Sequence, residues 1–378
     1  MKKFLVLVTV GLVCSAFAFA GGGKDTNTIS IGYVGPLSGG VAHYGTESRN
    51  GALLAIEEIN KAGGILGKQI AFKDEDDEGD AAKVINAFNR LVSQNKASFV
   101  IGSSTSGPTI AISDRAQAQK IILITPSGTN EAITQAGDYI FRACFIDPFQ
   151  GIAGANFAYD TIGARKAAIF FDNGNDYCVG LADSFRKQFK AKGGEIAADE
   201  SYQTGEVDFN AQLTKIRSVN PDIIFLPDYY QTVSLIAKQV RQLGMTIPLL
   251  GGDGWDGLID NAGDEALNGF FSTGFSAEST AANVQTFVKA YQARFGYTPD
   301  TFSALGYDCV LLLRDAIVKA GSADPSVVKG ALAEVSGNYI TGNIRYDANR
   351  DPIKGAVILE IVKKDGKLTT AYKTTVNP

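Results

Sequence analysis

The apolar positions of the chain change spacing in a regular rhythm. Short segments in which every second residue is apolar alternate with longer segments whose apolar residues stand three and four positions apart, as at Ala52, Ala55, Ile56 and Ile59. The first spacing predicts β-strands and the second predicts amphipathic helices. In the N-terminal part we expect strands at 28–34, 69–72, 98–101, 121–124 and 139–142, and helices at 45–60, 81–92 and 107–119.

The same alternation resumes farther along the chain. Expected helices at 149–162, 177–192, 208–218 and 230–243 alternate with expected strands at 167–171, 222–226 and 247–250. Such βα units form parallel sheets that are covered by helices on both faces. Two separate runs therefore predict an α/β protein with two doubly wound, Rossmann-like lobes. Ligands of such sheets bind beyond the carboxyl ends of the strands.

Length and charge agree with two lobes and argue against some partners. A chain of 378 residues is too long for one ordinary hydrophobic core. The formal net charge of −5 argues against binding to nucleic acid or to an anionic membrane surface.

Residues 1–20 have the features of a cleaved secretory signal peptide. Two lysines follow the initiator methionine, an apolar segment covers 4–20, and its end reads AFA before three glycines. We therefore expect cleavage after Ala20 and a periplasmic protein. A lipoprotein anchor at Cys14 is the less favoured alternative, because Val13 is not the small residue that such a motif requires.

The remaining cysteines are Cys144, Cys178 and Cys309. Their odd number and wide spacing predict neither a zinc site nor a disulfide framework. We expect buried thiols, and one disulfide between two of the three is the alternative.

Four hydroxyl residues, Ser103, Ser104, Thr105 and Ser106, follow the strand at 98–101. None of these serines has the flanking glycines of a G-x-S-x-G nucleophile elbow. A serine nucleophile also needs a base, usually a histidine, and the chain contains only one histidine, His43. We therefore predict that the protein is not an enzyme, and a secreted serine hydrolase is the remote alternative.

No segment has the residues and spacing of a phosphate-binding or metal-binding motif. Residues 62–69, AGGILGKQ, lack the first glycine and the final hydroxyl of a P-loop, and 251–257, GGDGWDG, lacks the spacing of a dinucleotide fingerprint. The acidic run 74–80 does not have the EF-hand pattern and is interpreted as a solvated loop whose Gly79-Asp80 end caps a helix. A single histidine excludes any multi-histidine metal site. We expect no cofactor and no metal.

Two hydroxyl loops at neighbouring strand ends suit a small anion. Hydroxyls and the free N–H groups of a helix start can bind a carboxylate as well as a phosphate. The second loop, 124–134, carries Ser127 and Thr129, although each alone is equally well explained as a helix N-cap. Asp253, between glycines at another strand end, could accept an α-ammonium group.

These segments, taken in order, identify a family resemblance. The chain resembles the periplasmic substrate-binding proteins of leucine/isoleucine/valine-type (branched-chain amino acid) ABC transporters over the whole mature length. The matching segments are IGYVGPLSGGVAHYG, GGILGKQI, KDEDDEGD, ITPSGTN, FFDNGNDYCVGLADSF, IIFLPDYYQTVSLIAKQVRQLG and LLGGDGWDG.

The resemblance implies a role for each matching position. Ser106 would bind the ligand carboxylate, Thr129 and the Ser127 carbonyl would fix the head group, and Asp253 would face the ammonium group. Further pocket positions implied in the same way are Tyr177 and Tyr229, which would close over the ligand, and Tyr44 and Phe302, which would contact its side chain.

Two positions depart from the pattern expected of a leucine binder. Ser104 and Thr105 stand where more apolar residues are expected, and Trp255 is close to Asp253. An unpaired hydroxyl in a dry pocket costs about 1–3 kcal/mol, so these side chains either turn away or meet a polar ligand. A small polar amino acid, an amide or urea is therefore an open alternative.

The resemblance also implies the type I periplasmic binding fold, with a three-stranded hinge between the lobes. Lobe 1 would comprise 24–146 and 277–349, and lobe 2 would comprise 147–276 and 350–378. Closure of the hinge would trap the ligand, and a membrane ABC permease would recognise the closed form. We expect a monomer; a sensor of the same fold is the alternative function.

Overall fold

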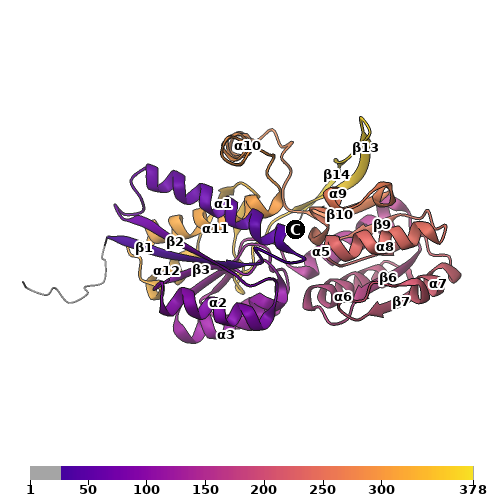
Figure 1. Cartoon of the computed structure of the whole chain (residues 1–378), viewed down its shortest axis with the longest axis horizontal. Helices are drawn as coiled ribbons and strands as arrows, with labels where there is room; N and C mark the ends of the chain where they lie inside the picture. Colours follow the sequence, from indigo (N-terminus) through magenta and orange to yellow (C-terminus); the bar gives the residue numbers. More distant parts are fainter. Residues whose placement is uncertain (1–26, 378) are drawn as a thin grey trace, which may run out of the picture.

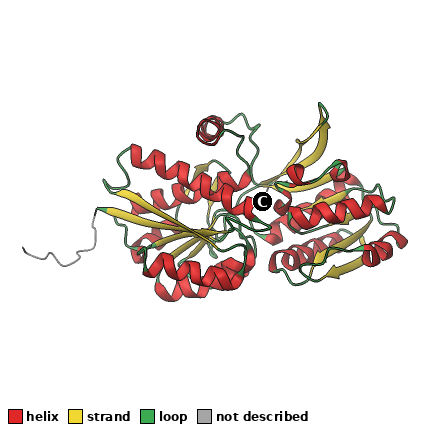
Figure 2. Ribbon diagram, viewed as in Figure 1, coloured by secondary structure: helices red, strands yellow, loops and turns green. Residues whose placement is uncertain are grey.

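A computed structural model of the protein describes residues 27–377. Two β-sheets lie side by side, each flanked by helices, and together they give the molecule an elongated, two-lobed shape (Figure 1). Figure 2 shows the strands of each sheet enclosed between layers of helices.

The first sheet has five parallel strands in the order β2-β1-β3-β4-β5. Helices α1 and α11 pack together above this sheet in the view of Figure 1, and α2 and α3 lie below it. The strands are β1 (Thr28–Gly35), β2 (Gln69–Asp76), β3 (Phe99–Gly102), β4 (Ile122–Thr125) and β5 (Ile140–Arg142). The helices are α1 (Ala42–Lys61), α2 (Ala81–Ser93), α3 (Ser106–Gln119), α4 (Ala132–Gln135), α10 (Ala282–Phe295), α11 (Thr301–Ala320) and α12 (Pro325–Ala333).

The second sheet has seven strands in the order β14-β13-β10-β9-β8-β6-β7. Its first five strands along the chain are parallel, and β13 and β14 add an antiparallel edge. The strands are β6 (Lys166–Asp172), β7 (Glu195–Tyr202), β8 (Ile223–Phe225), β9 (Leu249–Gly251), β10 (Gly269–Thr273), β13 (Ala356–Lys364) and β14 (Lys367–Val376). The helices are α5 (Asp147–Asn156), the π-helix η1 (Phe157–Ile162), α6 (Asp176–Ala191), α7 (Asn210–Ser218), α8 (Tyr230–Gln242), η2 (Asp253–Trp255), α9 (Leu258–Asn261) and η3 (Asp264–Ala266).

Alternation along the strands places a hydrophobic core on each face of the second sheet. On β6, Ala168 and Phe170 join one core with residues of α7 and α8, while Ala167 and Ile169 join another with residues of α5 and α6. The first lobe has one large core, which includes Ile31 of β1 and residues of the surrounding helices. Each sheet therefore has its own buried interior, as expected for a doubly wound lobe.

The chain passes between the sheets at three places. These connections join β5 to α5, β10 to α10, and the hairpin of β11 (Ser336–Tyr339) and β12 (Gly342–Arg345) to β13. A buried ion pair ties two of them together, since Arg142 Nε at the end of β5 lies 2.6 Å from Asp351 Oδ1 before β13.

The predicted alternation of strands and helices is confirmed, with differences at several boundaries. The predicted helix 149–162 is an α-helix over 147–156 that continues as the π-helix η1. Strands β7, β13 and β14 were not predicted, because their half-exposed or mixed residues do not give a clear apolar spacing. Strand β10 was also not predicted; it is buried throughout and too short for its pattern to be distinctive.

The interpretation of 74–80 as a solvated loop is wrong for half of the run. Strand β2 continues to Asp76, and Asp77 is fully buried because its carboxylate accepts a hydrogen bond from Ser103 Oγ at 2.7 Å. Asp80 does cap α2, since its side chain accepts from the backbone N–H groups of Ala82 and Lys83.

Two further observations concern the environment of the chain. Cys144, Cys178 and Cys309 are buried free thiols, as predicted. Across 27–377, none of the helices combines the length and the apolar character that crossing a bilayer requires. The predicted signal peptide and Cys14 lie outside the described residues.

Candidate functional site

A small cavity lies between the lobes, at the carboxyl ends of strands from both sheets. About 220 Å³ of space not filled by atoms lies there, part of it open to solvent. Nine of the ten residues predicted from the sequence line it together with Gly254: Tyr44, Ser104, Thr105, Ser106, Ser127, Tyr177, Tyr229, Asp253 and Phe302. The tenth, Thr129, is 1% exposed and does not line the cavity.

The first hydroxyl loop presents the start of a helix to this cavity. Ser106 is the first residue of α3, and its hydroxyl accepts a hydrogen bond from Asn130 N at 3.3 Å. Thr105 precedes it, and its hydroxyl is buried without a hydrogen-bond partner. The free N–H groups and the positive end of the helix dipole favour an anion at this position.

Ser103 and Ser104 support the loop from behind. Ser103 is not a simple turn residue, because it is fully buried, donates its hydroxyl to Asp77 and accepts at its carbonyl from Thr125 Oγ1 at 2.6 Å. Ser104 Oγ lies 3.0 Å from Tyr33 OH, so its hydroxyl has a protein partner. Of the two unexpected hydroxyls, Thr105 is therefore the one that lacks a partner.

The second hydroxyl loop is fixed by a buried guanidinium group. Arg142 donates from Nη1 to Gly128 O and from Nη2 to Asn130 O, both at 2.8 Å. Ser127 Oγ donates to Ser104 O at 2.7 Å and so joins the two loops. Thr129 is buried, and its side chain lies beside the Asp147 carboxylate.

Asp253 lies on the opposite wall of the cavity, in η2 of the second lobe. Gln150 Nε2 and the Tyr177 hydroxyl both donate to its Oδ1, at 3.0 and 3.1 Å, and its backbone N–H donates to Gln150 Oε1. Burial raises the pKa of Asp253 to about 6, although these hydrogen bonds oppose the rise. A Cβ at Gly252 would stand 2.6 Å from both Gln150 Oε1 and Tyr177 OH, so the glycine is required for this close packing.

Two residues near Asp253, Gln150 and Asp147, were missed by the sequence analysis. Gln150 is 1% exposed and orients the Asp253 carboxylate through the contacts above. Asp147 is 1% exposed, and its carboxylate forms no ion pair with the described residues. Burial raises the pKa of Asp147 to about 8, and Thr129 and Arg142 oppose the rise while Asp253 and Glu131 add to it. The available signal was position, since both residues follow the predicted strand 139–142.

Aromatic side chains cover the cavity from both lobes. Asn175 caps α6 by accepting from Tyr177 N, which places the Tyr177 ring in the first turn, where it stacks on Tyr229 with the ring centroids 5.2 Å apart. The ring of Tyr44, in the first lobe, packs against Phe302 with the ring centroids 4.5 Å apart. Its hydroxyl donates a hydrogen bond to Gly254 O across the cleft at 2.6 Å.

Trp255 does not line the cavity. Its ring is buried in the core of the second lobe, and its Nε1–H donates to Leu226 O at 2.9 Å. The proximity to Asp253 in the sequence therefore does not place the indole beside a ligand.

The two walls of the cavity favour charges of opposite sign. The start of α3, which favours an anion, lines it from the first lobe, and the Asp253 carboxylate lines it from the second. A molecule that carries both a carboxylate and an ammonium group matches this arrangement.

Comparisons with known proteins agree with the fold. The family model for periplasmic binding proteins matches residues 28–367. The Leu/Ile/Val-binding protein BraC3 of Rhizobium johnstonii is 32% identical over 309 residues, which cover 81% of this chain and 83% of the relative. The leucine-, isoleucine-, valine-, threonine- and alanine-binding protein of Pseudomonas aeruginosa is 30% identical over 88% of this chain and 89% of its own.

Solved structures show the same architecture. The branched-chain amino acid transporter substrate-binding protein LivJ of Streptococcus pneumoniae, in complex with isoleucine, has a TM-score of 0.84 and 37% identity over 92% of this chain and 99% of its own. The leucine-binding protein LivK of Thermotoga maritima has a TM-score of 0.87 and 33% identity over 93% of this chain and 99% of its own. The chain belongs to the periplasmic binding protein family, with relatives of the leucine/isoleucine/valine-binding type.

Proposed function

We propose that the protein captures an aliphatic α-amino acid between its two lobes and delivers it to a membrane ABC importer. The observation that carries this proposal is the polarity of the cavity, with the N-terminus of α3 on one wall and the buried Asp253 carboxylate on the other. The names of the relatives support the same ligand class, since they refer to leucine, isoleucine and valine.

The head group of the amino acid would be bound from both lobes. Ser106 would donate its amide and hydroxyl to the carboxylate, and the Ser127 carbonyl, the Thr129 hydroxyl and Asp253 would receive the ammonium group. The unpartnered Thr105 hydroxyl, which lines the cavity, supports a polar ligand contact there, because a buried hydroxyl without a partner costs about 1–3 kcal/mol. Tyr44, Tyr177, Tyr229 and Phe302 would enclose the aliphatic side chain.

Ligand capture would use closure of the lobes about the three connections. Contacts across the cleft, such as Asn130 Nδ2 to Asp176 O at 2.9 Å and Tyr44 OH to Gly254 O, support a closed form that excludes water. Exclusion of water strengthens the interactions of the head group with Ser106 and Asp253. The proposed lobes comprise 24–146 with 277–349 and 147–276 with 350–378.

The polarity of the cavity leaves a more polar or non-amino ligand as the alternative. The unpartnered Thr105 hydroxyl also suits a small polar amino acid, an amide or urea. A solute-binding protein of Rhodopseudomonas palustris with 25% identity and a TM-score of 0.82 was solved in complex with benzoate. The buried Asp253 argues against benzoate here, because a ligand without an ammonium group would leave that carboxylate uncompensated.

The remaining assignments are part of the same proposal. We infer export to the periplasm after cleavage of residues 1–20, function as a monomer, and no covalent chemistry. Against a serine hydrolase stands the position of His43, which pairs with Asp300 and does not line the cavity that contains the serines.

A thermal-shift screen of the mature protein tests the proposal. The probes are all proteinogenic amino acids, urea, acetamide, benzoate and 4-methylpentanoate, the last being leucine without its amino group. A ligand at a hundredfold excess over its Kd stabilises the protein by about 2.7 kcal/mol. We expect shifts with aliphatic α-amino acids only, abolished by Asp253→Asn and retained by the exposed control Asp260→Asn. A shift with 4-methylpentanoate that survives Asp253→Asn would overturn the proposal.

A further inference from the structure

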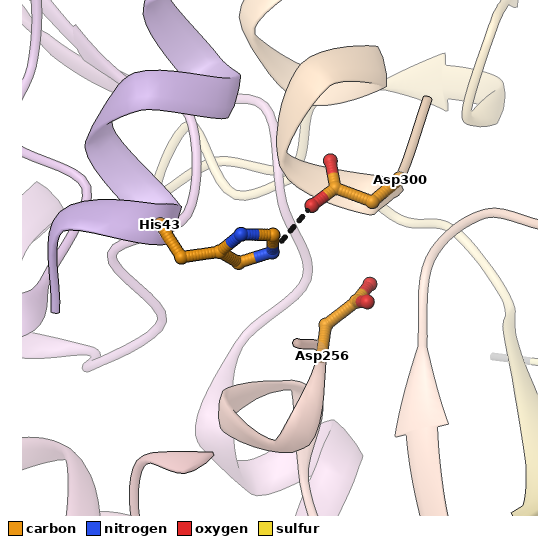
Figure 3. A group of neighbouring side chains, drawn as sticks. All are labelled: His43, Asp256 and Asp300. Atoms are coloured by element: carbon orange, nitrogen blue, oxygen red, sulfur yellow. Dashed lines mark ion pairs between the residues drawn. The ribbon is translucent and has the colours of Figure 1, made fainter. Parts of the chain in front are cut away.

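A second group of polar side chains bridges the lobes outside the amino-acid cavity. His43 lies in the first turn of α1, Asp300 is the N-cap of α11, and Asp256 follows η2 in the second lobe. His43 Nε2 lies 2.8 Å from Asp300 Oδ2, and one ligand atom from each of the three residues lies within 4.8 Å of the other two. Figure 3 shows the three side chains converging on a common point from separate elements.

These residues line a wider cavity that shares none of its lining residues with the amino-acid cavity. About 1390 Å³ of space not filled by atoms lies in this cavity, part of it open to solvent. Its described lining includes no Lys or Arg and, besides His43, carries the carboxylates of Glu47, Asp256, Asp260, Glu278 and Asp300. A cavity with this composition attracts cations.

One carboxylate at the centre of this group has no cationic partner among the described residues. Asp256 has one hydrogen-bond donor, the backbone N–H of Thr301 at 3.4 Å. The Thr301 hydroxyl, on a residue 2% exposed, also has no partner, and Thr301 lines the cavity. His43 lies against Asp300 and not against Asp256, so a cation held between the three side chains would supply the partner that Asp256 lacks.

We propose that His43, Asp256 and Asp300 form a binding site for a divalent transition-metal ion such as Zn²⁺ that connects the two lobes. One imidazole and two carboxylates are a ligand set that such ions accept, with the fourth position open to water from the cavity. Metal–ligand distances of about 2.0–2.1 Å require ligand atoms about 3.3 Å apart in a tetrahedral site. The present separations are 2.8 Å for the His43–Asp300 pair and at most 4.8 Å within the group, a range that includes this value.

An ion at this position would stabilise the closed form. His43 and Asp300 belong to the first lobe and Asp256 to the second, so coordination by all three is possible only when the lobes are together. Binding of the metal and of the amino acid would then favour each other by the same factor, as linkage requires. This coupling rests on the proposed amino-acid function, whereas the metal site does not.

Calorimetric titration of Zn²⁺ into the mature protein, without amino acid, tests the site. We expect stoichiometric binding in the wild type and at least about tenfold weaker binding in His43→Ala and Asp256→Asn. The matched control is Asp260→Asn, an exposed carboxylate on the same cavity, and its Zn²⁺ affinity should stay within about twofold of the wild type. His43→Gln replaces His43→Ala if the latter fails to fold, as judged by circular dichroism.

Co²⁺ absorption gives a second readout that a purely structural role of Asp256 would not move. We expect a visible d–d spectrum in the wild type that disappears in Asp256→Asn. Absence of Zn²⁺ binding, or equal weakening in Asp260→Asn, would overturn the site. If Zn²⁺ binds but leaves the Kd for leucine unchanged relative to EDTA-treated protein, the coupling is overturned. If no amino acid binds at all, the proposed function fails, and the Zn²⁺ titration still decides the site.

Discussion

Replacement of Asp147 by Asn should change how the stability of the protein depends on pH. Asp147 is 1% exposed and forms no ion pair with the described residues, so ionisation places a poorly compensated charge in the interior. Its pKa of about 8 compares with about 3.9 for an aspartate in an unfolded chain. Asn has a similar shape and no charge, so Asp147→Asn removes the titration and little else.

The direction follows from proton binding in the two states. Between about pH 4 and 8 the folded protein holds a proton on Asp147 that the unfolded chain has released. The free energy of unfolding of the wild type therefore falls as pH rises through this window, by about 1.4 kcal/mol per pH unit from this group alone. The free energy of unfolding of Asp147→Asn, minus that of the wild type, should therefore rise by about 1.4 kcal/mol per pH unit from pH 5 to 8. Above about pH 8 this difference should stay constant.

Urea unfolding followed by circular dichroism from pH 5 to 9 measures this difference. Groups that titrate in both proteins cancel in the comparison between wild type and variant. Exposed Asp176, at the start of α6, supplies the control, and Asp176→Asn should follow the wild type within about 0.5 kcal/mol at every pH. A pH-independent difference between Asp147→Asn and the wild type would show that Asp147 is ionised in the fold, and the reasoning would be wrong.

Three other substitutions test the support of the site. Arg142→Met should destabilise the protein by about 3–5 kcal/mol in urea unfolding, because it leaves Asp351 buried without its partner; a loss below about 1 kcal/mol would contradict this. Tyr44→Phe removes the donor to Gly254 O across the cleft and should weaken amino-acid binding about fivefold by calorimetry, and unchanged affinity would show that this bond does not contribute to closure. Thr105→Val removes an unpartnered buried hydroxyl; the ligand-free protein should keep or gain thermal stability while affinity falls, and a large loss of ligand-free stability would contradict its assignment as a ligand contact.

The sequence supported the fold and most of the cavity for a physical reason. In a doubly wound lobe, ligand-facing groups follow the carboxyl ends of strands, so Ser106 after β3 and Ser127 after β4 could be placed at one edge before any coordinates. Asp253 was found in the same way, between glycines after β9. The residue patterns alone did not predict how these residues lie relative to each other. The family resemblance implied that they share one site, and the structure places them around one cavity.

What could not be predicted depends on contacts between distant segments. Ser103 and Asp77 are 26 residues apart, and nothing in either local pattern indicates that they form a buried hydrogen bond. Gln150 contacts Asp253 from 103 positions away, and His43 meets Asp300 only when α1 and α11 pack together. The strands β13 and β14 carry many half-exposed residues, so their spacing gave no clear prediction.

Calorimetric binding of leucine and of 4-methylpentanoate to wild type and Asp253→Asn tests the central claim most directly. The account predicts that leucine binds the wild type and that 4-methylpentanoate does not measurably bind it. It also predicts that Asp253→Asn weakens leucine binding at least about thirtyfold, because the ammonium group loses a buried carboxylate partner. Equal affinities of wild type and Asp253→Asn for leucine would contradict the claim that the Asp253 carboxylate receives the ammonium group.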